Sequence, residues 1–420
     1  MTPGLARDLG LPPDCAADIG RGSVLILRER DPARFLARFF AAVDRGCSLW
    51  LASPDWGARR MAELETLAAE HPMPSSIMIP SGGTTGLLRF AVHDWDTLRE
   101  SAEGFLDFFA QRAGHRALCV LPLHHVSGLM QAVRVAVAGG RLAHGDAHAP
   151  QAGLPDGFEP EGFFISLVPT QLVRLMDDGA ADWLRRFACI LLGGAAADAA
   201  LLERARAAGL PISPCYGMSE TAALVAALKP EDFLREGASG GVGKALPHVQ
   251  ISIEAAEPAQ GGRIVRKRGE TLAQGDEGRI VLRAGSLCKA LIPGAATDPA
   301  TGLRTSDRGL FDARGRLHVL GRMDRVIVSG GLKLDPEEIE KALMDTGTVK
   351  EVTVQGMPDQ LWGEAATAFY VPKGESCTEA ALREHVRKKL SPAHVPKRWI
   401  RLAALPRNEA GKISSADCSD

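Results

Sequence analysis

A run of serine, glycine and threonine residues, Ser81-Gly82-Gly83-Thr84-Thr85-Gly86, could bind phosphate groups. Its glycines allow a sharp turn that exposes successive amide groups, and its hydroxyls add donors for phosphate oxygens. The Gly-Lys-Ser/Thr ending of a Walker loop is absent, because Leu87 and Leu88 follow and residues 88–92 look extended. The run therefore predicts either a phosphate loop or a glycine-rich hairpin turn.

The segment Cys215–Thr221 combines three groups that suit a nucleotide. The ring of Tyr216 could cover a purine, the hydroxyl of Ser219 could meet a phosphate, and the carboxylate of Glu220 could bind a hard cation such as Mg²⁺. The alternative is the end of a strand followed by a helix, with Ser219 as the N-cap and Glu220 in the first turn.

Two further candidates lie nearer the carboxyl end of the chain. Asp307, after Thr305 and Ser306, could bind both hydroxyls of a ribose, although aspartates at such places commonly make turns. Lys412 follows Gly411 in a polar stretch, where a lysine is usually a solvated surface charge. Nothing in its immediate surroundings predicts a catalytic role.

The elements that must position these residues alternate in the manner of an α/β protein. Short apolar runs at 76–80 and 188–192 predict buried strands, and Asp94 or Asp96 could cap a helix that continues from Leu98 to Phe109. From Gly278 the pattern changes to short strands at 278–283, 309–312 and 316–320.

A domain boundary is expected near Gly321–Arg325. Beyond it, Asp335 and Pro336 make a good N-cap and first-turn pair for a helix over Glu337–Met344. We therefore expect a large domain of residues 1–321, built of β-sheets flanked by helices, and a small mobile α+β domain of residues 322–420.

The overall composition narrows the choice of function. Of the 420 residues, 45% are hydrophobic and 24% charged, and the formal net charge is -2, so no electrostatic argument favours nucleic acid or an anionic membrane. The first twenty residues do not resemble a signal peptide, and no apolar run is long enough to span a membrane. The eight cysteines are spread singly, which favours reduced thiols in the cytoplasm over a zinc or disulfide framework. The sequence carries no signal for oligomeric state.

The order and spacing of these segments resemble the adenylate-forming superfamily, which includes acyl-CoA synthetases, peptide-synthetase adenylation domains and luciferases. The resemblance extends from about Pro74 to Ile413. It also includes Gly193-Gly194-Ala195, a Gly-x-Gly-Lys turn at Gly241–Lys244, and a Gly-Arg-x-Asp segment at Gly321–Asp324.

The resemblance implies roles for residues that otherwise have none. Those implied to bind ATP are Ser81, Gly82, Gly83, Thr84, Thr85 and Gly86 at the β- and γ-phosphates, Gly193, Gly194, Ala195, Tyr216 and Gly217 around adenine, Ser219 at the α-phosphate, and Asp307 at the ribose with Arg322 nearby. Glu220 would hold Mg²⁺. Leu88-Arg89 replaces the usual Pro-Lys of the phosphate loop, and Arg89 keeps the positive charge.

The resemblance also implies a moving lysine. Lys412 would enter from the small domain and bridge the substrate carboxylate and the α-phosphate, where charge builds in the transition state. The small domain would then swing about Asp324, withdraw the lysine and admit the thiol of coenzyme A. The expected activity is that of an AMP-forming acid–thiol ligase, with ATP, Mg²⁺, coenzyme A and a small carboxylic acid as its partners and with no nucleic acid or membrane.

The run Leu121–Met130 (LPLHHVSGLM) is similar to the o-succinylbenzoate–CoA ligases of menaquinone and phylloquinone synthesis. The segment Ser166–Arg174 resembles the same group. That acid has two carboxylates, so one must be matched by a cation while the other reacts. Arg174 is the candidate for that cation, and Ser166 is a candidate for the wall of the acyl pocket. His125 could line the same pocket, or it could act in catalysis by orienting the adenylate while the thioester forms. Arg174 could instead be a surface residue of a helix, and His125 a packed histidine.

Three other functions remain open at this point. The chain could be a CoA ligase for another aryl or medium-chain acid, a stand-alone adenylation domain that loads a carrier protein, or a non-catalytic sensor of nucleotide or acyl-CoA. The presence of Glu220, Asp307 and Lys412 together argues against the sensor.

Overall fold

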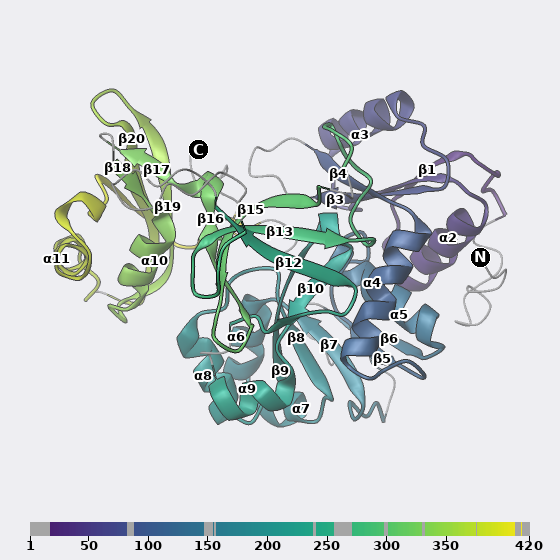
Figure 1. Cartoon of the computed structure of the whole chain (residues 1–420), viewed down its shortest axis with the longest axis horizontal. Helices are drawn as coiled ribbons and strands as arrows, with labels where there is room; N and C mark the ends of the chain where they lie inside the picture. The colour runs from purple at the N-terminus through teal and green to yellow at the C-terminus, as the bar shows by residue number, and fades with distance from the viewer. Residues whose placement is uncertain are drawn as a thin grey trace. The chain divides into compact units, whose positions relative to one another are not determined.

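A computed structural model describes residues 17–81, 88–146, 154, 157–237, 241–255, 271–297, 301–329, 332–374, 376–407 and 413. The chain forms two compact units, which are coloured along the chain in Figure 1. The large unit contains most of the chain up to Val319. The small unit contains the chain from Leu320 together with the short segment Ser306–Gly309.

The first sheet of the large unit has five strands in the order β1-β2-β3-β4-β14. Strands β1 to β3 are parallel, whereas β4 is antiparallel to both β3 and β14. Its strands and the two helices that pack on it are β1 (Val24–Leu27), β2 (Ser48–Leu51), β3 (Ser76–Ser81), β4 (Arg89–His93), β14 (Ala290–Ile292), α2 (Pro32–Asp44) and α3 (Ala58–Glu70).

The second sheet has seven strands in the order β11-β10-β9-β8-β7-β5-β6, of which the last five are parallel. Its strands are β5 (Arg116–Cys119), β6 (Arg141–His144), β7 (Phe163–Leu167), β8 (Cys189–Leu192), β9 (Ile212–Met218), β10 (Ala223–Ala227) and β11 (Lys244–Ala245). The helices around it are α4 (Trp95–Phe108), α5 (Val126–Ala138), α6 (Pro169–Asp177), α7 (Ala181–Arg185), α8 (Ala199–Ala207) and α9 (Pro230–Glu236).

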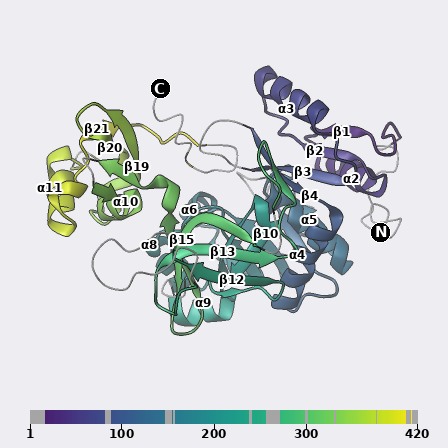
Figure 2. The same cartoon turned by 45° about the horizontal axis from the view of Figure 1, so that its top comes forward.

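Helices cover both faces of this sheet. Successive residues of a strand point to opposite faces. Ile165 and Ile190 accordingly pack with α6 to α9, whereas Phe164 and Leu191 pack with α4. Figures 1 and 2 show α4 and α5 on one side of the sheet and α6, α8 and α9 on the other. The predicted α/β fold is therefore confirmed.

A third sheet has the order β12-β13-β15-β16 and encloses a core that contains Ile253, Ile280 and Leu317. Its strands are β12 (Val249–Glu254), β13 (Gly278–Ala284), β15 (Leu303–Phe311) and β16 (Leu317–Arg322).

The small unit is a sheet with two helices on one face. The strand order is β18-β17-β20-β19, and β21 pairs with β20. Its elements are β17 (Ile327–Ser329), β18 (Leu332–Leu334), α10 (Pro336–Met344), β19 (Val349–Asp359), β20 (Gly363–Pro372), α11 (Glu379–Lys389) and β21 (Arg398–Arg401). Ile339 and Leu343 of α10 and Leu382 and Val386 of α11 form a separate core with β19 and β20.

Several predicted elements are confirmed with small shifts at their ends. Asp94 caps α4 through a reciprocal pair of hydrogen bonds with Thr97, and Asp335 caps α10 with Pro336 in its first turn. Asp307 belongs to the nine-residue strand β15, so the alternative in which this aspartate makes a turn does not apply.

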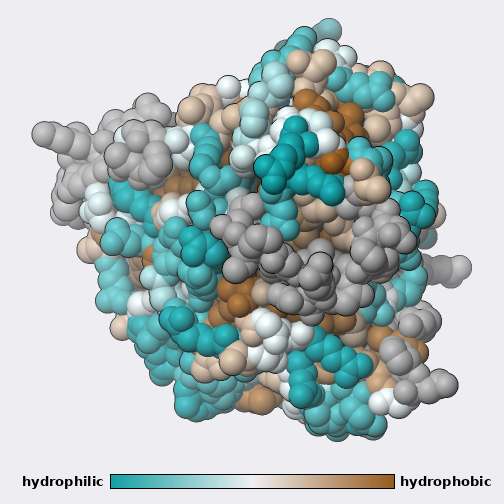
Figure 3. Space-filling model, turned by 90° about the vertical axis from the view of Figure 1, so that its right-hand side faces the viewer, coloured by the Kyte–Doolittle hydropathy of each residue, from teal (hydrophilic) through white to brown (hydrophobic). Residues whose placement is uncertain are grey.

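Among the described residues, no helix is long and apolar enough to cross a membrane. On the face that Figure 3 shows, hydrophilic side chains cover much of the surface and hydrophobic ones appear in separate areas between them.

Candidate active site

The predicted site residues of the large unit gather at the carboxyl edge of the seven-stranded sheet. Parallel strands end together at one edge, which is where α/β proteins bind ligands. Here β5, β7, β8 and β9 lead respectively into Leu121–His125, Val168, Gly193–Ala195 and Ser219–Thr221. Segments that are far apart in the sequence are thus neighbours in space.

Gly193 and Tyr216 are brought together by the pairing of β8 with β9. Leu192 is opposite Pro214, so the next residue, Gly193, lies beside Cys215. A Cβ atom on Gly193 would stand 2.8 Å from the Cys215 sulfur, and Gly194 has a φ of +82°, which favours glycine. The Gly193-Gly194-Ala195 turn and the strand that carries Tyr216 therefore need this close approach.

The turn after Tyr216 is unusual in its backbone. The carbonyl oxygen of Ala223 packs against Gly217, where a Cβ atom would lie only 1.9 Å from it, so this contact requires glycine. The short 3₁₀ helix η2 (Ser219–Thr221) follows, and then Ala222 and Ala223 have φ values of 52° and 81°. Such values are costly for alanine and persist only where the surroundings enforce them. The buried hydroxyl of Ser101 donates to the Ala222 carbonyl at 2.6 Å and helps to hold the turn.

Glu220 and Ser81 are in contact although they lie 139 positions apart in the sequence. The Ser81 hydroxyl donates to Glu220 Oε1 at 2.6 Å, and the Ser219 hydroxyl donates to the Pro80 carbonyl at 2.9 Å. The turn after β9 is thereby joined to the end of β3.

The glycine-rich run joins two antiparallel strands. Ser81 and Arg89 are paired residues of β3 and β4, so the run connects them as a hairpin. The residues Gly82, Gly83, Thr84, Thr85 and Gly86 lie outside the described part of the chain. Arg89 is exposed at the start of β4. The described residues here thus offer a ligand the hydroxyl of Ser81, the cation of Arg89 and the carboxylate of Glu220.

His93 supports this site, and the sequence analysis did not identify it. Its Nε2 donates to the Ser219 carbonyl at 2.8 Å, and its Nδ1 lies 3.0 Å from the Thr97 hydroxyl. Burial lowers the pKa of His93 to about 4, so the ring is neutral at pH 7. The only local signal was its position at the end of β4, directly before the capping residue Asp94.

His125 is the N-cap residue of α5, and its ring lies 4.4 Å from that of His124. The segment before it folds back closely over the helix. A Cβ atom on Gly128 would stand 2.2 Å from the Pro122 carbonyl oxygen, so this approach requires glycine. Because β5 runs parallel to β8 and β9, the segment after it lies at the carboxyl edge of the sheet. His125 is therefore at the same edge as Gly193 and Tyr216.

Ser166 lies in β7, one residue before that strand ends, and Arg174 lies in α6 with its side chain half-buried. Arg174 lies one turn after Gln171 in this helix. Gln171 accepts a hydrogen bond from the backbone N–H of Val168 at 3.0 Å and so closes the start of the helix.

Arg134 of α5 is a buried cation that the sequence analysis did not identify. Its guanidinium lies over the Phe105 ring at 3.9 Å, and its Nε and Nη2 have no hydrogen-bond partner among the described residues. Burial lowers the pKa of Arg134 only to about 10, so it stays charged. Its charge acts on Cys215, the neighbour of Gly193. Because an unmatched buried charge is costly, Arg134 is a second candidate for binding an anion.

The other predicted residues belong to the small unit. Asp307 in β15 is buried, and Arg322 at the end of β16 binds Asp324 through two hydrogen bonds. Lys412 lies outside the described residues. The ends of its segment are nevertheless fixed, because Arg407 and Ile413 form an antiparallel bridge and Arg407 Nη2 lies 3.1 Å from Glu351 Oε2.

Comparisons with known proteins identify the family of the chain. A family model described as AMP-binding enzyme matches residues 59–289, and one described as AMP-binding enzyme C-terminal domain matches residues 338–412. The chain is 32% identical to a 2-succinylbenzoate–CoA ligase of Geobacillus kaustophilus, over 93% of this chain and 77% of that protein. It is 29% identical to an indoleacetate–CoA ligase of Aromatoleum aromaticum, over 82% and 67% of the two chains.

Solved structures share the fold. The o-succinylbenzoate CoA synthetase of Bacillus subtilis, in complex with its acyl-adenylate intermediate, superimposes with a TM-score of 0.77 at 23% identity and covers 99% of this chain and 91% of its own. ATP-bound MatB of Rhodopseudomonas palustris also gives a TM-score of 0.77, at 21% identity, and covers 99% and 90%.

Proposed function

Since the chain belongs to the family of AMP-binding enzymes, we propose that it is an ATP-dependent acid–thiol ligase that converts 2-succinylbenzoate into its coenzyme A thioester. The same relationship supports ATP, Mg²⁺ and coenzyme A as the other reactants, a place in the synthesis of menaquinone or phylloquinone, and a location in the cytoplasm. The observation that carries the proposal is the Ser81–Glu220 contact, which joins the phosphate-loop hairpin to the turn after Tyr216.

Glu220 fits a magnesium site of the kind that nucleotides use. Mg²⁺ in such sites takes one or two carboxylates, and phosphate oxygens and water supply the remaining ligands. Among the described residues no cluster of three or more His, Cys, Asp or Glu side chains could hold a metal ion. Glu220 would be one protein ligand of the Mg²⁺. A bound Mg²⁺ would neutralise phosphate charge. Ser81 orients the carboxylate, and His93 holds the Ser219 backbone beside it.

The reaction has two balanced steps. A carboxylate oxygen of the acid attacks the α-phosphorus of ATP, and pyrophosphate leaves. The thiol sulfur of coenzyme A then attacks the acyl carbon, the thiol proton is released to solvent, and AMP leaves. Neither step needs a covalent bond to the protein, so the chain contributes positioning and charge neutralisation. In this scheme Ser219, Asp307 and Tyr216 hold the nucleotide, and Lys412 stabilises the charge of the first transition state.

The second carboxylate of the substrate requires a cation within the acyl pocket. We assign this role to Arg174 of α6. Arg134 is the alternative, because it is a buried charge near Cys215.

The proposal is tested by a screen of carboxylic acids that measures pyrophosphate release and thioester formation with and without coenzyme A. We expect strong preference for 2-succinylbenzoate and thioester only when coenzyme A is present. Preference for indoleacetate or another aryl acid would show that the proposed substrate is wrong, while the ligase activity would stand. Transfer of the acyl group to a carrier protein but not to coenzyme A would show that coenzyme A is not the acceptor. Failure to release pyrophosphate with any acid would refute the ligase function.

A further inference from the structure

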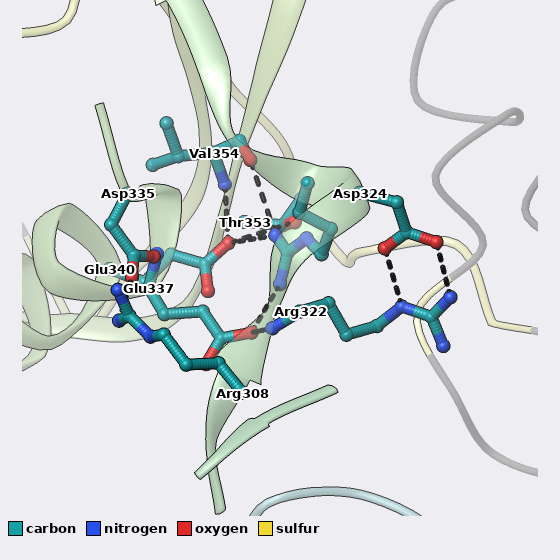
Figure 4. A network of polar contacts seen from close by, with 9 residues as sticks. Arg308, Arg322, Asp324, Asp335, Glu337, Glu340, Thr353 and Val354 are labelled. Carbon is teal, nitrogen blue, oxygen red and sulfur yellow. Dashed lines mark hydrogen bonds and ion pairs between the residues drawn. The ribbon is translucent and has the colours of Figure 1, made fainter. Parts of the chain in front are cut away.

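The segment between β16 and β17 of the small unit contains the proposed hinge Asp324 within the 3₁₀ helix η4 (Met323–Arg325). Figure 4 shows the polar contacts around it. Residues before the hinge and residues after it meet in this network. Contacts of that kind must change when the chain rotates at the hinge.

Glu337, in the first turn of α10, contacts the chain just before the hinge. Its Oε1 accepts a hydrogen bond from the backbone N–H of Arg322 at 3.3 Å. The carboxylate also occupies the space beside Gly321, where a Cβ atom would stand 2.3 Å from Oε2. Gly321 has a φ of +136°, a backbone conformation that favours glycine. The close approach of the Glu337 carboxylate also requires a residue without a Cβ atom.

The oxygen that accepts from Arg322 also faces a cation, Arg325. Arg325 Nη1 lies 3.5 Å from Glu337 Oε1, while Arg325 Nη2 donates to Glu340 Oε1 at 2.6 Å and to the Val354 carbonyl at 3.2 Å. Glu340 in turn accepts from the Val354 N–H at 2.7 Å. Arg325 is therefore held by the body of the small unit. The pKa of Glu337 is raised, mainly because the carboxylate is partly removed from water. The charge of Arg325 opposes this shift, and the charges of Glu340 and Asp335 add to it.

A second contact joins the same helix turn to a residue before the hinge. Arg308, in the β15 segment that belongs to the small unit, donates to Asp335 Oδ2 at 2.6 Å. Asp335 Oδ1 caps α10 by accepting from the Glu337 N–H at 2.9 Å. The start of α10 thus binds the chain on the amino-terminal side of Asp324 at two points.

We propose that Glu337 is a positioning residue that latches the hinge: its carboxylate holds Gly321 and Arg322 in this conformation and must release them when the small domain turns between the two half-reactions. The inference rests on the proposed function, because only a two-step ligase requires two placements of the small domain. The latch is defined here as the contacts of Glu337 with Gly321, Arg322 and Arg325.

Glu338 provides a matched control on the same turn. Both glutamates are in the first turn of α10, where a negative charge is favoured by the helix dipole. The Glu338 side chain is 56% exposed and faces His394 at 3.9 Å, away from the hinge contacts. A difference between Glu337→Ala and Glu338→Ala therefore reports the latch and not the end of the helix.

The first measurement does not depend on the substrate. Limited trypsin digestion of the full-length protein, without ligands, should cut after Arg322 or Arg325 about fivefold faster in Glu337→Ala than in the wild type, which corresponds to about 1 kcal/mol. Glu338→Ala should be cut at the wild-type rate. Glu337→Gln keeps an oxygen that can accept from Arg322, so it should fall between the two.

The second measurement compares the half-reactions. The rate of adenylate formation from acid and ATP, divided by the rate of thioester formation from pre-made adenylate, should change by about fivefold in Glu337→Ala and stay constant in Glu338→Ala. Equal cleavage in both variants and an unchanged ratio would overturn the latch. If no acid is activated by the wild-type protein, the proposed function fails, whereas the cleavage test still decides whether Glu337 holds the hinge segment.

Discussion

Replacement of Lys412 should separate the two half-reactions at the scale of a single residue. Lys412→Ala removes a charge contact made in the transition state, so adenylate formation should slow by a few hundredfold, or about 3–4 kcal/mol. Thioester formation from pre-made acyl-adenylate should remain. Stopped-flow measurement of pyrophosphate release tests the first step. Adenylate formation near the wild-type rate would show that Lys412 has another role.

Arg174 and Arg134 can be distinguished by their effects on two acids. Arg174→Ala should raise the KM for 2-succinylbenzoate at least tenfold, about 1.4 kcal/mol, because its second carboxylate loses a charge-assisted hydrogen bond. The KM for ATP and for an analogue that lacks this carboxylate should barely change.

Arg134→Met serves as the comparison for that prediction. Exchange of an unmatched buried charge for an apolar side chain of similar length is often neutral or stabilising, so the melting temperature should not fall. If Arg134→Met alone weakens the dianionic acid selectively, the carboxylate binds at α5 and the assignment to Arg174 is wrong. Equal losses for both acids in either variant would indicate general damage.

At the scale of elements, His93 of β4 contacts η2 through the Ser219 carbonyl, and this buried histidine makes the free energy of unfolding depend on pH. The pKa of His93 is about 4 in the folded state, against 6.5 ordinarily, so the unfolded chain takes up this proton first as the pH falls. The contribution is fully present above pH 6.5 and is lost progressively toward pH 4. At pH 5 the loss amounts to about 2 kcal/mol.

His93→Gln should remove that dependence. Urea unfolding should be measured at pH 8, 6.5 and 5. As the pH is lowered, the free energy of unfolding should decrease less in the variant than in the wild type. Buried His115 and His248, whose pKa values burial lowers to about 3 and about 4, contribute equally to both proteins and cancel in the comparison. Parallel curves would contradict the prediction.

The elements also explain which features could be predicted from the sequence. Strand β8 and the start of α10 follow from local patterns, an apolar run and an Asp-Pro cap, and both were predicted. The contact of His93 with Ser219 joins residues 126 positions apart, and no local pattern encodes it. The left-handed Ala222 and Ala223 could not be predicted either, because alanine has no preference for such a backbone and Ser101 of another helix helps to impose it.

At the scale of the whole molecule, the hinge should control only one half-reaction. Asp324→Pro fixes φ and restricts rotation, so adenylate formation should survive while transfer to coenzyme A falls sharply. Asp324→Ala is the matched control, because it also loses the hydrogen bonds from Arg322 but keeps a rotatable backbone. Equal loss of both half-reactions in Asp324→Pro would indicate misfolding and would contradict the assigned hinge.

The separate core of the small unit, built from Ile339, Leu343, Leu382 and Val386 with β19 and β20, has a calorimetric consequence. Two cores that share few side chains form two cooperative blocks, so the heat-capacity curve should contain two overlapping transitions and a calorimetric enthalpy above the van't Hoff value. Saturating AMP, for which Ser219 and Tyr216 of the large unit are proposed ligands, should move the larger transition upward. A single transition with equal enthalpies would show that the two blocks unfold as one.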